Sequence, residues 1–477
     1  MRHLFFIVLL FSAISMLAQS GYSIRFHVEG LRDTTAYLGY YYGESTFVKD
    51  TAKVNSKGDF VFDGKQALPK GVYFLVLNRT RIVELVVSDV QRFSLETNTS
   101  DYVKNMKVTG DVDNKLFFEN MIFNMERHKE AEPFLKNIQD STLKDDQKKD
   151  AREGFTKIDE KVKAYQDDII ARYPNTLTAK IFKANKSIIV PDPPKKADGS
   201  IDSAFQLRYF REHFFDNFDL SDDALIRMPR PIYSEKINEY IDKLYAPQAD
   251  SAMKAIHRIV EKSKKNQETY KYSVWVNMLK YQNPEIMGLD EVFVRLYDTY
   301  FGSGQMDFWA NASLKKNLKE HADRLRKSLI GQTGANLIMQ DSNLKPRSMY
   351  DIKSKYTILF IYDPDCGHCK KETPKLVDFY TKYKTKHNVE VYAVNADSSM
   401  AKMKDYIKEM NMKWITVNGP RTYVGPYQDL YDAITTPTLY VLDDKKKIIA
   451  KKIPIEKLDE FFTNYEKLKK STSPQKL

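Results

Sequence analysis

The sequence predicts a multidomain α+β protein with an N-terminal antiparallel β-sandwich, a helical middle region and a C-terminal α/β domain. Three observations lead to this fold class. Apolar residues alternate with period two up to about residue 110, recur at helical spacing up to about residue 329, and then form short β-rich runs between helical stretches. The length of 477 residues also exceeds one ordinary core, since a domain takes about 100 to 200 residues.

The start of the chain predicts a secretory signal peptide over residues 1–20. Met1–His3 is a cationic lead, Leu4–Leu17 is an apolar run, and Ala18–Ser20 offers small residues for cleavage. The run is only about 14 residues long, whereas a membrane span needs roughly 20. No cysteine follows it for lipid attachment. We therefore expect a cleaved signal, a periplasmic location and no stable membrane insertion after cleavage.

Residues 21–110 are predicted to form the β-sandwich. Ile24, Phe26 and Val28 alternate with polar residues, and Asn55–Asp59 and Pro69–Gly71 are turn sequences. Several short strands at such spacing indicate a small antiparallel sandwich. No catalytic cluster stands out in this region.

Residues 111–329 are predicted to be helical. Phe118, Met121, Ile122 and Met125 fall at i, i+3, i+4 and i+7, which is the spacing of one helix face. A Pro-rich segment, 191–199, cannot continue a helix and is predicted to be a loop. The many aromatic residues of this region are expected in its core rather than in a peptide groove.

Residues 330–470 are predicted to form an α/β domain, and 471–477 a disordered tail. Strands that alternate with helices imply a mixed sheet covered on both faces. The expected strands are 356–362, 389–394 and a hairpin of 438–442 with 447–451, and the expected helices are 374–383, 400–410 and 455–468.

Cys366 and Cys369 are the only cysteines, and two residues separate them. A bridge across so short a loop stabilises a fold little, so the pair is expected to serve chemistry. A buried strand precedes Cys366 and a helix follows it, so both sulfurs should lie at a helix start, where unpaired N–H groups favour a thiolate. We predict that Cys366 attacks and that Cys369 resolves the mixed disulfide. His368 can add positive charge beside the sulfur.

The run CGHCKKETP after a strand, with Thr436–Pro437 about seventy residues later, resembles the thioredoxin fold and specifically the exported TlpA-like thiol:disulfide oxidoreductases. The resemblance covers roughly residues 330–470, and CGHC is also similar to protein disulfide isomerase. It implies that Pro374 kinks the active-site helix and that Pro437 is a cis-proline beside the disulfide. It further implies that the backbone around Thr436 pairs with an extended substrate segment.

Three positions bear on the expected chemistry. Thioredoxin has a buried Asp where this chain has Phe360, which removes a proton acceptor. Glu372, one helical turn after Cys369, matches a functional Glu of some exported members and is a candidate replacement. Asp365 adds an acid directly before Cys366, which is expected to raise the pKa of that thiol.

The predicted function is thiol:disulfide exchange with protein substrates, with reduction slightly favoured by the family resemblance. No metal or organic cofactor is expected, because the two cysteines carry the electrons. The expected partners are protein thiols or disulfides and a membrane or periplasmic electron donor or acceptor. Nucleic acid is not expected, because the cationic residues behind the net charge of +11 alternate with acids, as in KDDQKKDAREGF.

Three other functions could use parts of the same sequence. A zinc site needs four ligands, and a second cysteine pair is missing. A thiol peroxidase of the same fold resembles P-x-x-x-T-x-x-C, but Asp363 stands where that Thr would be. A periplasmic or surface binding protein with a structural thioredoxin-like domain stays open, because most of the chain has no assigned role.

Overall fold

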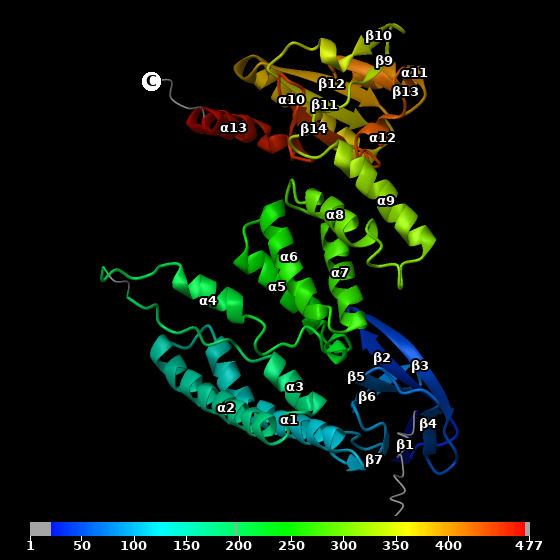
Figure 1. Ribbon diagram of the computed structural model, residues 1–477, viewed down its shortest axis with the longest axis vertical. Coiled ribbons are helices and arrows are strands. Elements are labelled where there is room, and N and C mark those ends of the chain that lie inside the picture. The colour runs from blue at the N-terminus through cyan, green and yellow to red at the C-terminus, as the bar shows by residue number, and fades with distance from the viewer. Residues whose placement is uncertain (1–20, 196–197, 473–477) are drawn as a thin grey trace, which may run out of the picture. The chain divides into compact units, whose positions relative to one another are not determined.

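The computed structural model describes residues 21–195 and 198–472 and is drawn in Figure 1. The predicted signal peptide, residues 1–20, lies outside these ranges. None of the helices within them combines the length and apolar character that a membrane span requires. Two compact units make up the chain: one holds the residues up to Tyr240 with Lys262–Thr269, the other Ile241–Glu261 with the residues from Tyr270 onward. The domain boundaries given above stay predictions.

Two four-stranded sheets form the β-rich part of the first unit. Their strand orders are β4-β1-β7-β8 and β3-β2-β5-β6. Both sheets contribute to one apolar core, in which Ile24, Leu38, Phe62 and Leu85 are each 0% exposed. The predicted sandwich is therefore confirmed. The strands are β1 (Tyr22–Glu29), β2 (Thr35–Tyr42), β3 (Ser45–Lys53), β4 (Asp59–Gly64), β5 (Gly71–Leu77), β6 (Thr80–Val87), β7 (Arg92–Asn98) and β8 (Lys107–Thr109).

One strand pair departs from the predicted antiparallel arrangement. β1 and β7 run parallel, with Ile24 opposite Phe93 and Phe26 opposite Leu95. After β4 the chain forms the β5–β6 hairpin in the other sheet, and on its return β7 enters in the direction of β1. The sequence does not distinguish the two directions, because side chains alternate with period two in both.

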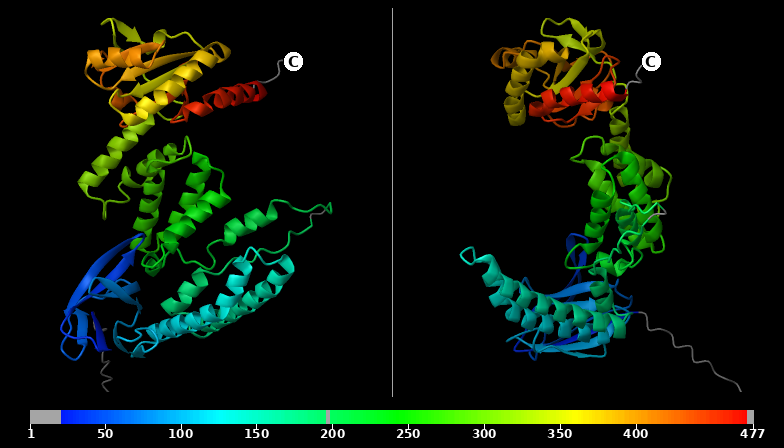
Figure 2. Two further views of the ribbon diagram at one scale, coloured as in Figure 1. Left: turned by 180° about the vertical axis from the view of Figure 1, so that it is seen from behind. Right: turned by 90° about the vertical axis from the view of Figure 1, so that its left-hand side faces the viewer.

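Helices follow from Val112. The Asp111 side chain caps α1 by accepting hydrogen bonds from the N–H groups of Asp113 and Asn114. α1 and α2 lie side by side in the views of Figures 1 and 2. The described residues of the Pro-rich segment 191–199 are not helical, as expected. The helical elements are α1 (Val112–Gln139), α2 (Asp145–Arg172), α3 (Leu177–Ala184), α4 (Phe205–His213), η1 (Asp223–Ile226), α5 (Ile232–Leu244), α6 (Ala249–Ser263), α7 (Gln267–Gln282), α8 (Asp290–Leu296), η2 (Tyr297–Phe301) and α9 (Ala312–Lys327).

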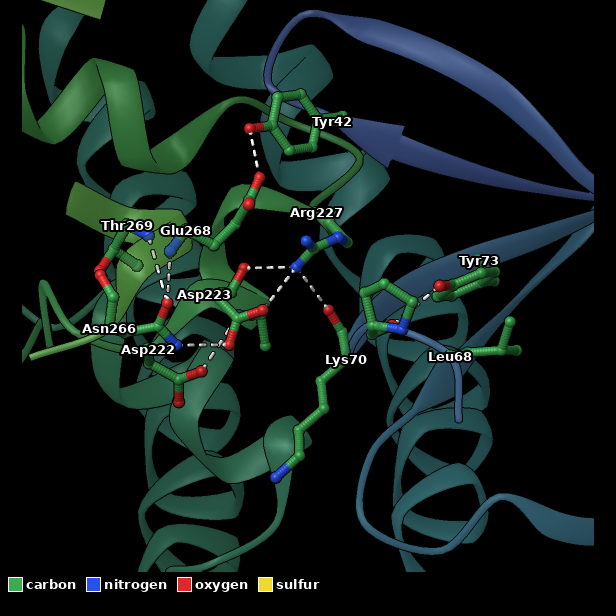
Figure 3. A network of polar contacts seen from close by, with 12 residues as sticks. Tyr42, Leu68, Lys70, Tyr73, Asp222, Asp223, Arg227, Asn266, Glu268 and Thr269 are labelled. Atoms are coloured by element: carbon green, nitrogen blue, oxygen red, sulfur yellow. Dashed lines mark hydrogen bonds and ion pairs between the residues drawn. The ribbon is translucent and has the colours of Figure 1, made fainter. Parts of the chain in front are cut away.

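A buried arginine joins the sandwich to the helical part of the same unit, as Figure 3 shows. Arg227 is 5% exposed, and its Nη1 donates to the Asp223 carboxylate at 2.8 Å and to the Lys70 carbonyl at 3.3 Å. The Val72 N–H donates to the Arg227 carbonyl at 2.8 Å. The backbones approach so closely that a Cβ on Gly71 would lie 2.3 Å from the Arg227 Cβ. Gly71 is therefore required at this contact.

A seven-stranded mixed sheet forms the core of the C-terminal domain, with the order β10-β9-β13-β12-β11-β14-β15. β11 lies inside the sheet and is buried along its whole length; it is parallel to β12 and antiparallel to β14. One face packs against α10, α11 and α13, and the other carries a second apolar cluster. The predicted thioredoxin-like mixed sheet is thus confirmed. The strands are β9 (Ile338–Asp341), β10 (Pro346–Ser348), β11 (Tyr356–Tyr362), β12 (Val389–Asn395), β13 (Ile415–Thr422), β14 (Thr438–Leu442) and β15 (Ile448–Lys451).

The three expected helices are present as α10 (Gly367–His387), α11 (Met400–Glu409) and α13 (Leu458–Thr472), but α10 begins earlier and ends later than 374–383, and residues 455–457 form the separate turn η4. The short elements η3 and α12 were not predicted, nor were strands β9, β10 and β13. β13 contains Gly419–Pro420, and its pairing with β9 shifts register between Asn418 and Thr422. Gly and Pro are usually excluded from regular strands, which is why the sequence does not predict this irregular one. α13 continues to Thr472, past the predicted start of the tail, and 473–477 lie outside the described ranges. The helical elements are η3 (Met349–Asp351), α10 (Gly367–His387), α11 (Met400–Glu409), α12 (Tyr427–Leu430), η4 (Ile455–Lys457) and α13 (Leu458–Thr472).

Replacing Arg227 should destabilise the first unit. In Arg227→Met the Lys70 carbonyl and the Asp223 carboxylate, whose side chain is 27% exposed, lose their charged partner. We expect the free energy of unfolding to fall by about 2–3 kcal/mol, measured by urea denaturation of the full chain. Arg230→Met is the matched control, because the Arg230 side chain is 74% exposed in its pair with Glu235. Equal midpoints for the two variants would contradict the structural role of Arg227.

Candidate functional site

The strand β11 and the helix α10 hold the cysteine pair at one edge of the sheet. β11 ends at Tyr362 and α10 begins at Gly367, with Cys366 as the residue that precedes the first turn. The connecting turn is closed by two hydrogen bonds to Asp363: the Cys366 N–H donates to its carbonyl at 3.1 Å and the Asp365 N–H to its carboxylate at 2.8 Å. Cys366 is therefore fixed at the helix start, as its spacing from the strand predicts.

The neighbouring strand brings a second backbone segment to the same sulfur. β14 is antiparallel to β11, with Thr438 opposite Ile361, so the start of β14 lies beside the end of β11. The Thr436–Pro437 peptide bond just before β14 is cis, as the resemblance implies. The Thr436 carbonyl accepts a hydrogen bond from the Cys366 Sγ at 3.4 Å. The segment that was predicted to bind substrate thus lies directly against the first cysteine.

The Cys366 thiol is half-buried and has a lowered pKa. Its partial burial alone would raise the pKa, but several hydrogen bonds to the sulfur outweigh this effect. The N–H groups of Cys369 and His368 make two of them, and the sulfur also has contacts with Thr436 and with the Cys369 side chain. N–H groups that point at the sulfur stabilise the thiolate over the thiol. This direction agrees with the helix-start argument made from the sequence.

The Cys369 thiol is the opposite case. It is 0% exposed, and this burial raises its pKa to about 12. The Asp363 N–H donates to its sulfur at 3.4 Å and opposes the shift only in part. At neutral pH the accessible sulfur is therefore the more readily ionised one, and the enclosed sulfur remains a thiol.

The side chains of two further predicted residues lie close to the pair in sequence, but no hydrogen bond joins either to a cysteine sulfur in the described structure. The Glu372 carboxylate accepts a hydrogen bond from Lys375 at 2.7 Å, and Lys375 also pairs with Glu456. His368 is exposed, and its backbone N–H rather than its ring acts on the Cys366 sulfur. The proposed proton-acceptor role of Glu372 and the charge role of the His368 ring stay predictions.

The acid before Cys366 has a cationic partner that the sequence analysis missed. Lys402 of α11 donates to the Asp365 carboxylate at 2.6 Å and to the Asp397 carboxylate at 3.0 Å. The charge of Asp365 is therefore compensated, and the expected rise in the pKa of Cys366 is not what the structure gives. A separation of 37 positions between Asp365 and Lys402 leaves no signal of this contact in the sequence.

A group of buried side chains beside Cys369 was also missed. Phe360 is 1% exposed, which agrees with the loss of a carboxylate inferred from the sequence, and it stacks on Tyr362. The Tyr362 ring in turn stacks on Tyr406 of α11. Period two along β11 was the available signal, because it places residue 362 on the same side as residue 360. Across the described ranges, no group of three or more His, Cys, Asp or Glu side chains is placed to hold a metal ion.

Three family models match the chain, each over a different part. The AhpC/TSA family matches residues 330–451. Two domains of unknown function, DUF4369 and DUF5106, match residues 22–117 and 176–323. The redox assignment therefore concerns the C-terminal domain.

Curated relatives and solved structures with similarity to the chain carry redox names. The thiol-disulfide oxidoreductase ResA of Bacillus cereus is 28% identical over 126 residues, which is 26% of this chain and 70% of that protein. ResA of Bacillus thuringiensis subsp. konkukian is 30% identical over 120 residues, 25% of this chain and 67% of that protein. A domain of a possible thiol-disulfide isomerase from Cytophaga hutchinsonii is 40% identical, with a TM-score of 0.29, and the match covers 30% of this chain and 97% of that one.

The AhpC/TSA match includes β11 and α10, which hold the cysteine pair. The 30% identity to ResA of Bacillus thuringiensis subsp. konkukian extends over 67% of that protein. The chain is a thiol-disulfide oxidoreductase, and through its C-terminal domain it belongs to the TlpA-like family.

Proposed function

We propose that this protein is exported and exchanges disulfides with protein substrates through Cys366 and Cys369. The proposal is supported mainly by the difference between the two thiols in burial and in pKa. Cys366 is half-buried with a lowered pKa, and Cys369 is fully buried with a raised one. Exchange requires one nucleophile that meets the substrate and a second that acts only after capture.

The reaction has two steps. The Cys366 thiolate attacks one sulfur of the substrate disulfide; a bond from Cys366 to that sulfur forms, the substrate bond breaks, and the other substrate sulfur leaves and takes up a proton. Cys369 then attacks Cys366, the Cys366–Cys369 disulfide forms, and the second substrate thiol leaves. Glu372 is the proposed acceptor of the Cys369 proton. No cofactor enters, since the pair itself carries two electrons.

Substrate is proposed to bind as an extended segment along the backbone of Thr436 and Pro437. The proximity of the Thr436 carbonyl to the Cys366 sulfur, 3.4 Å, supports this placement. A strand-like peptide that adds to an exposed edge gains affinity from main-chain hydrogen bonds and therefore tolerates many sequences.

A periplasmic location and a reducing direction complete the proposal. The cationic lead and apolar run of residues 1–20 support export. In that compartment the pair would need a membrane or periplasmic electron donor after each reduction. The potential against glutathione distinguishes the directions: a value near about −270 mV supports a reductase and one near about −120 mV an oxidant.

The pH dependence of alkylation tests the thiol assignment. In Cys369→Ser the rate of reaction of Cys366 with iodoacetamide should rise with pH through a midpoint below about 8.5, the ordinary value for a thiol. A lowered pKa means that the thiolate persists to lower pH than in an unfolded chain. A midpoint at or above the ordinary value would contradict the proposed nucleophile.

Lys402→Met should raise that midpoint by a few tenths of a pH unit. The variant leaves the Asp365 carboxylate uncompensated beside the sulfur, and a nearby negative charge disfavours the thiolate. The effect is small because both side chains are solvated, 49% and 66% exposed. Lys404→Met removes the same charge from an exposed position of the same helix and serves as the control. An equal shift in both variants would show that Asp365 is not involved.

A trapping experiment tests the protein-substrate role. Cys369→Ser should capture partners in disulfide-linked adducts on Cys366 in cells, seen on non-reducing gels, because the second step is blocked. Cys366→Ser should capture none. The wild-type protein should reduce insulin when dithiothreitol is supplied. Adducts that fail to form, together with inactivity on insulin, would refute the proposal; consumption of hydrogen peroxide alone would point instead to a thiol peroxidase.

A further inference from the structure

Side chains with hydroxyl groups, contributed by three elements, lie in the core near the second cysteine, Cys369. Cys369 shares a buried cluster with Phe360, Tyr362 and Tyr406. The rings of Tyr362 and Tyr406 stack with centroids 5.0 Å apart and planes at 19°. Thr373, 0% exposed and one helical turn after Cys369, shares a 2.9 Å hydrogen bond with the Tyr406 hydroxyl. β11, α10 and α11 therefore each contribute a hydroxyl to this cluster.

The Tyr362 hydroxyl is the member of this cluster that has no partner. Tyr362 is 0% exposed, and among the described residues none hydrogen-bonds to its Oη. Nearly all buried polar groups in folded proteins are paired, so an exception calls for an explanation. Burial, followed by the nearby Tyr406 and Cys369, raises the pKa of Tyr362, so the phenol remains a neutral hydrogen-bond donor. Because Cys369 contributes to this shift, a charge on its sulfur acts on the Tyr362 hydroxyl.

Among the described residues, few groups stabilise an anion on the second cysteine: the Asp363 N–H and a contact with Thr436 lower its pKa, but burial outweighs them. To attack the mixed disulfide, Cys369 must lose its proton in surroundings that exclude water. One N–H, that of Asp363, donates to the sulfur, at 3.4 Å. Phe360 offers no polar atom, and Glu372 is bonded to Lys375. A buried thiolate without further donors forms slowly, because removal of a charge from water is costly.

We propose that the Tyr362 hydroxyl donates a hydrogen bond to the Cys369 thiolate as that anion forms, and that Tyr406 and Thr373 are positioning residues that hold the Tyr362 ring. This inference rests on the proposed exchange reaction. In the dithiol state no hydrogen bond joins Tyr362 to Cys369, so the bond requires the two side chains to move toward each other when the sulfur acquires charge. A donor used only at that moment accelerates the step without stabilising the resting state.

The step balances without another reagent. The Cys369 thiol gives its proton to Glu372, the acceptor proposed above, its sulfur attacks the Cys366 sulfur, and the Cys366–Cys369 bond forms as the Cys366–substrate bond breaks. The substrate sulfur leaves with the electron pair and takes up one proton. Tyr362 keeps its own proton throughout, because it acts as a hydrogen-bond donor and not as an acid.

The titratable groups around this sulfur are few in the described structure. Cys366, directly before α10, influences the pKa of Cys369, and Cys369 influences the pKa of Tyr362 of β11. Tyr406 of α11 is influenced by both cysteines, and Glu409 of the same helix acts on Tyr406. Burial raises the pKa of Tyr406 to about 12, so that phenol too stays protonated at neutral pH.

A two-phase reaction separates the action of Tyr362 from that of the first cysteine. The reduced full-length protein is mixed with the aromatic disulfide dithiobis(nitrobenzoic acid), whose coloured thiolate is released twice. The first release reports attack by Cys366, and the second reports attack by Cys369 on the mixed disulfide. In Tyr362→Phe the first phase should be unchanged. The second should slow by about tenfold at neutral pH, with its pH midpoint about one unit higher.

Tyr356→Phe is the matched control. Tyr356 lies on the same strand and the same side as Tyr362, but its hydroxyl bonds to Glu466 at the other end of β11. This variant should leave the second phase and its midpoint unchanged. Tyr406→Phe and Thr373→Val should each give a smaller upward shift than Tyr362→Phe, because they act through the ring position.

Stability provides a second readout. Tyr362→Phe removes a buried polar group that has no partner, so the thermal midpoint should stay equal or rise. A slower second phase in an equally stable protein supports the proposal. Wild-type kinetics in Tyr362→Phe would overturn it, as would a slower phase without a pH shift. A wild-type protein that shows no second release would instead overturn the exchange reaction itself.

Discussion

The arrangement of the site depends on one constraint: the residue that precedes the first turn of the helix α10 must be a cysteine. Cys366 precedes the first turn of α10, and its sulfur lies between backbone N–H groups of that turn and the Thr436 carbonyl. The N–H groups cannot bond within the helix, so they remain available to an anion. The register of β11 with β14 brings the second segment to this point. Neither feature requires a charged side chain near the sulfur.

The burial of Cys369 follows from the same geometry. A residue three positions into a helix that packs on a sheet turns toward the sheet, and Cys369 enters the core beside Phe360 and Tyr362. Burial raises its pKa, so it is a thiol at neutral pH. In the proposed exchange this difference in solvent access would order the two steps. Phe360 stands where a carboxylate would otherwise lie, and the neighbouring tyrosines add no permanent buried charge.

The rest of the chain is organised separately from this chemistry. The sandwich and the first helices form one unit, in which Arg227 and the close approach at Gly71 tie sheet to helix. Family models of unknown function match residues 22–117 and 176–323, whereas the AhpC/TSA model matches residues 330–451. The residues of the described site all come from the C-terminal domain.

By itself the sequence determined the fold class, the cysteine pair and the helix that follows it, whereas the place of Pro437 beside the pair was implied by the family resemblance. These are local features, since a strand, a turn and a helix start are encoded by neighbouring residues. It did not determine that β1 and β7 are parallel, that Lys402 compensates Asp365, or that Tyr406 reaches Tyr362. Each of these joins residues far apart in the chain, and only the packing of strands and helices into a common core decides which distant side chains meet.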